Sequence, residues 1–177
     1  FPTLGQHCPH IRSLHVSGWQ EVRGLNIASF TSFCPLIVNL ELSMCNTLTD
    51  ADLLGIVQNL PGLRSIRLHA FKFILTDEGI GHITKYCADT LEVFQIKFCT
   101  ANALLTQTSL DALRQRCTKL HTFHCVGSID LTQDLQCFTV LEIHSENLTN
   151  PVLKTIADNC PELQVMDFWF GVKYKRC

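Results

Sequence analysis

Histidine and cysteine are the residue types here with the greatest capacity for chemistry, and they lie closest together in His121-Thr122-Phe123-His124-Cys125. Imidazole nitrogen and thiolate sulfur are common zinc ligands, so this segment is a candidate metal site. The hydrophobic pattern around it predicts a β-strand, in which side chains alternate between two faces. The two histidines then point to opposite faces, and the cysteine points to the core. A zinc site would require His124 to meet His144 or His69 from other strands, so we expect no metal.

Motifs typical of enzymes are missing from the sequence. It contains no C-x-x-C pair, no H-E-x-x-H zinc motif, no glycine-rich phosphate loop and no G-x-S-x-G nucleophile turn. We therefore expect no catalytic residues, no cofactor and no enzymatic activity.

A repeating unit positions these residues, and residues 34–60 show it most completely. Apolar residues at Ile37, Leu40 and Leu42 have the spacing of a short strand, and an inward-turning loop follows them. Thr49 can cap a helix because its side-chain oxygen can accept a hydrogen bond from a free amide at the helix start. The apolar residues that follow have helical periodicity. One unit is thus a strand followed by a helix.

The unit recurs from Cys8 to Cys34 and from Cys34 to Leu60, each a step of 26 residues, and seven such units cover residues 1–177 as a single domain. The apolar positions of the seven strands align as Ile11/Leu14/Val16, Ile37/Leu40/Leu42, Leu63/Ile66/Leu68, Leu91/Phe94/Ile96, Leu120/Phe123/Cys125, Phe138/Leu141/Ile143 and Leu163/Met166/Phe168.

The pattern resembles the cysteine-containing class of leucine-rich repeats, C-P-x-L-x-x-L-x-L-x-x-C-x-x-L-T-D followed by a helix. The matching segments are Cys34-Pro35, Cys45, Leu48-Thr49-Asp50, Leu75-Thr76-Asp77-Glu78-Gly79, Leu148-Thr149-Asn150 and Cys160-Pro161. The resemblance implies an α/β solenoid, a horseshoe arc with a concave parallel sheet and convex helices. That class is best known from F-box proteins, the substrate receptors of cullin-based ubiquitin ligases, and from smaller relatives that lack the F-box.

Some units depart from the template. Residues 70–73 replace the usual cysteine turn with an aromatic loop, and residues 100–107 lengthen the fourth unit. Residues 127–134 are too few and too polar for a full helix, so we expect a turn there. In the next unit Asn150 is expected to cap a helix that has Pro151 at its first position, where the missing amide of proline costs nothing.

Charge and hydropathy indicate the class of partner. The chain has 14 basic and 16 acidic residues and a net charge of -2, which gives no general attraction to nucleic acid or to an anionic membrane. No apolar run approaches the roughly 20 residues of a membrane span. A protein partner is therefore expected. The chain begins without methionine, and residues 4–7 resemble the end of an earlier helix, so we expect a fragment of a longer protein.

Seven of the ten cysteines occupy repeat positions. Cys8, Cys34, Cys87, Cys117 and Cys160 mark the starts of units, while Cys45 and Cys99 occupy the turn after a strand. Free cysteine is commonly buried as a small apolar residue, so we expect reduced thiols and a cytoplasmic or nuclear protein. The sequon Asn147-Leu148-Thr149 is the opposing signal.

The face away from the helices carries two columns of mostly polar residues, because alternation sends every second side chain there. The first column is His15, Glu41, Arg67, Gln95, His124, Glu142 and Asp167, and the second is Ser17, Ser43, His69, Lys97, Val126, His144 and Trp169. Two interpretations remain open: an ordinary solvated face, or a protein-recognition surface of the kind that solenoids form in their concavity.

For the second interpretation the expected partner contacts are Arg67, Gln95, Lys97, His124, His144, Trp169 and Phe170. Tryptophan and arginine are over-represented among residues that dominate binding energy. The aromatic pair at 169–170 has another interpretation, because a terminal repeat must shield its hydrophobic end.

Two hypotheses for function follow. From the resemblance, the chain is the substrate-recognition part of an F-box and leucine-rich-repeat protein, which holds a target while a ligase adds ubiquitin. No F-box lies within the chain, so adaptor and cullin would be reached only through an F-box outside it. The alternative is a free-standing leucine-rich-repeat scaffold or inhibitor without a ligase role. The sequence does not indicate the target protein.

Overall fold

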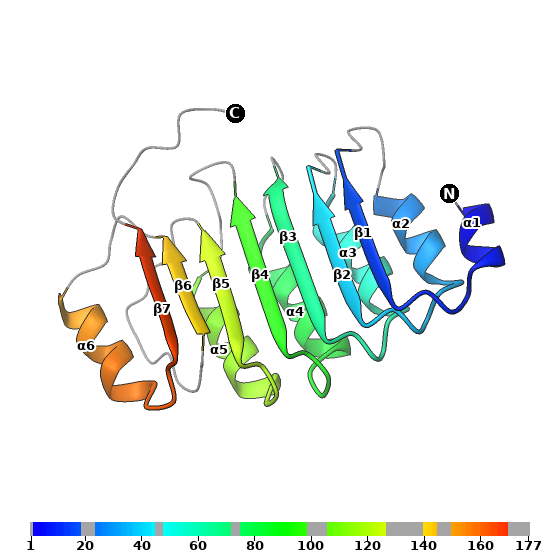
Figure 1. Cartoon of the computed structure of the whole chain (residues 1–177). Coiled ribbons are helices and arrows are strands. Elements are labelled where there is room, and N and C mark those ends of the chain that lie inside the picture. The colour runs from blue at the N-terminus through cyan, green and yellow to red at the C-terminus, as the bar shows by residue number, and fades with distance from the viewer. Residues whose placement is uncertain are drawn as a thin grey trace.

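The computed structural model describes residues 2–18, 24–44, 48–71, 75–98, 106–126, 140–144 and 150–169. Within these residues strands and helices alternate through most of the chain (Figure 1). The elements are α1 (Pro2–His7), β1 (Ser13–Ser17), α2 (Gly24–Thr31), β2 (Asn39–Ser43), α3 (Asp50–Val57), β3 (Ser65–Phe71), α4 (Asp77–Tyr86), β4 (Val93–Phe98), α5 (Gln107–Arg116), β5 (Thr122–Val126), β6 (Val140–His144), α6 (Asn150–Asn159) and β7 (Val165–Trp169).

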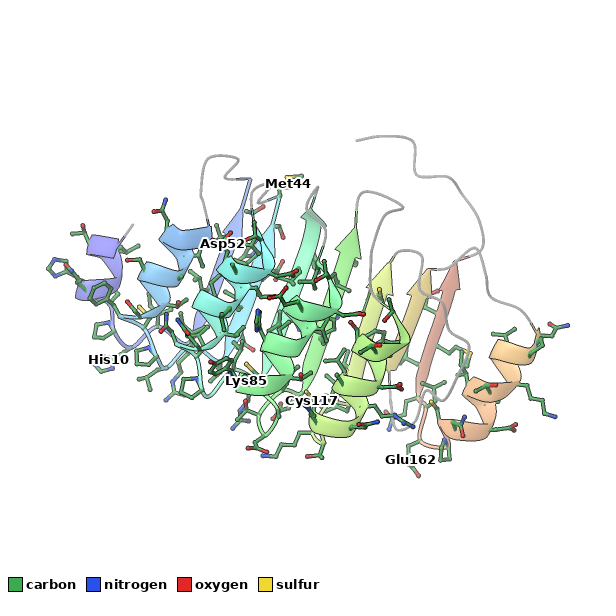
Figure 2. The ribbon with its side chains drawn as sticks, turned by 180° about the vertical axis from the view of Figure 1, so that it is seen from behind. His10, Met44, Asp52, Lys85, Cys117 and Glu162 are labelled. Carbon is green, nitrogen blue, oxygen red and sulfur yellow. The ribbon has the colours of Figure 1, made fainter. Side chains whose placement is uncertain are left out.

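The seven described strands form one parallel sheet in chain order, from β1 to β7. Parallel neighbours need a crossover between them, and described helices supply it for each neighbouring pair except β5 and β6. Helices α3 to α5 lie behind the strands in Figure 1 and in front of them in Figure 2, which shows the molecule from the opposite side. The chain is therefore an α/β layer of strands backed by helices, as the sequence predicted.

The strand register matches the predicted alignment of apolar residues. Leu40 pairs with Leu14 on one side and with Ile66 on the other, and the same column continues through Phe94 and Phe123. Side chains of this column pack with helix residues in one continuous core. The Phe94 and Phe123 rings stack with their centroids 6.0 Å apart. We call the opposite side of the sheet, which carries the two polar columns, the open face.

Threonine caps begin three successive helices. The hydroxyl of Thr49 accepts from the backbone amide of Asp52, whose carboxylate accepts in turn from the Thr49 amide at 3.0 Å. This reciprocal pair satisfies two amides that the helix itself leaves free. Thr76 and Thr106 likewise cap α4 and α5. The helix predicted after Thr49 is thus confirmed, with α3 starting at Asp50.

Asn59 connects the ends of two neighbouring helices. Its side-chain amide donates to the carbonyl of Ala28 in α2 at 3.0 Å and to that of Gly55 in α3 at 2.9 Å. The carbonyls in the last turn of a helix have fewer partners within the helix than those in its middle, and such a side chain supplies them with an additional donor. Adjacent helices are therefore held together at their C-terminal ends as well as through the core.

Several predictions concern residues outside those described: the turns at Cys45 and Cys99, most of the added segment 100–107, the turn at 127–134 and Phe170. The helix expected at Asn150 is present as α6, and it begins at Asn150 itself with Pro151 in its first turn. Among the described residues, no helix combines the length and apolarity that crossing a membrane requires.

Candidate protein-binding face

Register pairs bring the predicted polar columns together across the sheet. His15, Glu41, Arg67, Gln95, His124, Glu142 and Asp167 are successive neighbours, and so are Ser17, Ser43, His69, Lys97, Val126, His144 and Trp169. Each column therefore crosses all seven described strands. Adjacent strands lie about 4.8 Å apart, so a column extends roughly 29 Å.

The centre of the open face is cationic. Arg67 and His69 lie two residues apart on β3 and so share one face, while Lys97 is the register neighbour of His69 on β4. We call Arg67, Lys97 and the neighbouring His69 the cationic cluster, whose permanent positive charges are those of Arg67 and Lys97. The Arg67 Nε donates to the side-chain oxygen of Gln95 at 3.1 Å, which fixes the orientation of the guanidinium group.

Glu41 lies beside this cluster between two histidines. Its Oε1 is 3.6 Å from His15 Nε2 and 3.9 Å from His69 Nδ1. The side chains are partly open to solvent, with 59% of His15, 31% of Glu41 and 24% of His69 exposed. Contacts this long in a solvated setting contribute little to stability, typically about 0 to 1 kcal/mol. Glu41 therefore offsets only part of the positive charge.

The ionisation of His69 reflects this environment. Partial burial lowers the pKa of His69 below 6.5, and the positive charges of Lys97, Arg67 and His15 lower it further, while Glu41 acts in the opposite direction. The permanent positive charges among these neighbours are those of Arg67 and Lys97, and they outnumber the single carboxylate of Glu41. The local field at the centre of the open face is positive, although the whole chain carries a net charge of -2.

The remaining predicted contact residues have different surroundings. His124 lies in the first column beside Gln95, but its side chain is only 4% exposed, so little of it is available to a partner in this structure. The backbone positions of His144 and Trp169 are adjacent in the second column at the C-terminal end of the sheet. Phe170 lies outside the described residues.

Met44 is a feature of this surface that sequence reasoning missed. It follows β2, its φ is 56°, and its side chain is 53% exposed. Gly18 occupies the equivalent place after β1, with φ 71°, and both amides donate to the next strand, to Ser43 and His69 respectively. A left-handed backbone is easy for glycine but costs another residue about 1 to 2 kcal/mol. The sequence signal for this backbone conformation was that Met44 aligns with Gly18 of the preceding repeat.

The described side chains of the open face supply hydrogen bonds and charge. Among the residues that the structure describes, no three His, Cys, Asp or Glu side chains are grouped so that they could hold a metal ion. The six described cysteines are free thiols, and all except Cys8 are buried. A surface that offers hydrogen bonds and charge is suited to recognising the polar groups of another molecule.

Comparison with protein-family models and with curated proteins finds no match to this chain. The geometry of the open face and the repeat pattern are therefore the basis for a functional proposal.

Proposed function

We propose that the chain is a leucine-rich-repeat solenoid that binds another protein through its open face. One observation carries the proposal: the residues of the two columns occupy successive register positions on seven parallel strands, and the described side chains of these columns lie on the side of the sheet opposite the helices. Each repeat adds one strand to this surface, so the surface grows with the number of repeats. Extended binding surfaces of this kind are what repeat architectures provide.

The composition of the open face favours a protein over an apolar ligand. Apolar ligands occupy concave sites lined mainly by hydrophobic side chains, with a few polar groups that fix orientation. Here Arg67, Gln95 and Lys97 present donors and charge on adjacent strands, while the apolar column next to them is buried on the other side. These groups match the polar surface of a protein.

We further propose, from the resemblance to cysteine-containing leucine-rich repeats, that the chain is the substrate-recognition part of an F-box-type ubiquitin-ligase receptor. Adaptor and cullin would be recruited by an F-box outside this chain. The described free thiols fit a cytoplasmic or nuclear protein, in which cysteines are kept reduced. A scaffold or inhibitor with the same repeats is the alternative.

Affinity capture tests the proposal and separates these two roles. The full-length parent protein is used to capture proteins from cell extract, and the captured set is scored for a target, an adaptor and a cullin. A target together with adaptor and cullin supports the receptor. A target without them supports the scaffold or inhibitor. Failure of every captured protein to respond to substitutions on the open face would refute binding through that face.

A further inference from the structure

We propose that the cationic cluster of Arg67, His69 and Lys97 binds an acidic segment of the partner protein, with Asp or Glu carboxylates seated on Arg67 and Lys97. This inference rests on the proposed use of the open face for binding, and it specifies the chemistry of the partner.

Two arginines near the same pair of strands have different partners. Arg64, just before β3, pairs with the carboxylate of Glu92, just before β4, at 3.3 Å. Three residues further along each strand, on the open face, the corresponding pair is Arg67 with Gln95. The amide accepts a hydrogen bond as the carboxylate does, but it brings no negative charge. Arg67 is therefore held in place without being neutralised.

The donor geometry of Arg67 suits a carboxylate from outside the chain. Its Nε is used by Gln95, and within the described part of the chain no carboxylate lies within ion-pair distance of Arg67 or Lys97. A guanidinium group held through Nε presents its two terminal nitrogens together, and this fork matches the two oxygens of a carboxylate. Arg67 is thus positioned to donate two parallel hydrogen bonds to a carboxylate of the partner.

Charge is unevenly distributed along the open face. The cationic cluster occupies β3 and β4, whereas Glu142 and Asp167 occupy neighbouring register positions on β6 and β7, and Asp167 is exposed. Complementary charge steers a partner and fixes its orientation. An acidic segment is accordingly favoured over β3 and β4 and disfavoured over β6 and β7.

Met44 places an exposed apolar residue at the end of β2, beside the strand that carries Arg67 and His69 (Figure 2). The backbone amide of Met44 donates to the backbone carbonyl of His69 at 3.0 Å, so Met44 lies directly beside β3. Methionine is flexible and polarisable, and such residues are used on surfaces that adapt to a partner. Residues held in unfavourable backbone regions also concentrate at functional sites. A segment that combines acidic residues with an apolar one fits this border.

A selection from short random peptides displayed on phage tests the inference with a defined probe. The folded chain is immobilised, bound peptides are sequenced, and the best of them is synthesised for binding measurements. The expected winners are enriched in Asp and Glu. Reversing charge with Arg67→Glu and Lys97→Glu together should weaken their binding about tenfold or more, because charge-assisted hydrogen bonds are lost. Added salt should weaken binding to the unchanged chain.

A control with the same charge change isolates the position of the charges. Lys119→Glu and Lys154→Glu together alter exposed lysines in the turn after α5 and in α6, and they should leave binding unchanged. Folding of each variant is checked by its thermal unfolding. If the charge reversal prevents folding, Arg67→Gln with Lys97→Gln replaces it, and this milder pair should still weaken binding several-fold.

The outcomes separate this inference from the proposed function. Peptides without acidic enrichment, unaffected by the Arg67 and Lys97 changes but blocked by Ser43→Trp on the open face, would overturn the inference and leave the binding face intact. Selected peptides insensitive to all of these substitutions would overturn both. A library that yields no peptide bound at the open face would also count against both.

Discussion

The hydroxyl of Thr76 donates to the carboxylate of Asp50 at 2.6 Å, although the two residues are 26 positions apart. Asp50 opens α3 and Thr76 caps α4, so the contact joins the starts of consecutive helices. The same contact recurs one unit later, where the Thr106 hydroxyl donates to Asp77 at 2.6 Å. Each aspartate thus stabilises its own helix as a negative charge at the N-terminus and also holds the cap of the next helix.

Asp77→Asn should destabilise the chain by about 1 to 3 kcal/mol at neutral pH, because hydrogen bonds to a charged acceptor are weakened. Asp77 accepts from the hydroxyls of both Thr106 and Ser109. Glu78→Gln is the matched control, since it removes the same charge from the same helical turn without touching α5. The control should lose the helix-dipole contribution and a weak, exposed pair with His82 at 3.7 Å, together about 0.5 to 1 kcal/mol. Chemical denaturation measures both, and equal losses would show that the contact between helices is unimportant.

The effect of Asp77 should also depend on pH. Burial alone would raise the pKa of the Asp77 carboxyl, but hydrogen bonds from Ser109 and Thr106 outweigh it and bring the pKa below 3.8. A carboxyl whose pKa is lowered by folding contributes stability above its unfolded pKa, and this stability is lost as pH falls through the folded value. The difference between the native chain and Asp77→Asn should therefore shrink below about pH 4. A difference that is constant down to pH 2 would contradict this account.

Gly79→Ala should destabilise the chain, in contrast to the usual benefit of alanine within a helix. A Cβ at position 79 would collide with the Asp50 carboxylate and with the Leu75 side chain. Gly81 lies in the same helix, and a Cβ there meets nothing within 4 Å. Gly81→Ala should instead stabilise by about 0.5 to 1 kcal/mol, because alanine loses less backbone freedom on folding. The unfolding temperatures of the two variants should shift in opposite directions. Stabilisation by both substitutions would mean that Asp50 does not lie beside Gly79.

Leu40→Ala should destabilise by about 2 to 5 kcal/mol, because the side chain is fully buried between strands and helices. Glu41→Ala, one residue further along β2, should change stability by no more than about 0.5 kcal/mol, because its contacts with histidine are long and partly solvated. Similar losses from the two substitutions would mean that the assignment of the two sheet faces is wrong.

When the chain is denatured under non-reducing conditions, titration should detect about ten free thiols, which is the full number of cysteines. In the native chain Cys8 should react first among the six described cysteines, because the other five are buried. Burial also raises the pKa of Cys87 to about 12 and that of Cys117 to about 11, so almost no reactive thiolate is present at neutral pH. Four or more disulfides would contradict a reducing compartment.

The register and the helix starts could be predicted from sequence because each depends on local spacing. Apolar residues such as Leu40 and Leu42 fix which face of a strand is buried, and a one-residue slip would expose them all. The contact of Asp50 with Thr76 was not predicted, because it depends on the offset of two helix starts in space. The alternation of side chains along a strand also predicted the face of the sheet on which His124 lies. It did not predict that His124 is buried, because burial depends on the neighbouring side chains. The left-handed backbone of Met44 was not predicted, because methionine is not a residue type typical of turns.

Lysine acylation with and without a bound protein partner tests the use of the open face most directly. Lys97 is exposed on the open face, whereas Lys85, Lys119 and Lys154 are exposed in α4, in the turn after α5 and in α6. With a captured partner bound, acylation of Lys97 should slow, and the three other lysines should react as they do in the free chain. An unchanged rate at Lys97 together with protection of the other lysines would place the partner on the helices and contradict binding through the open face.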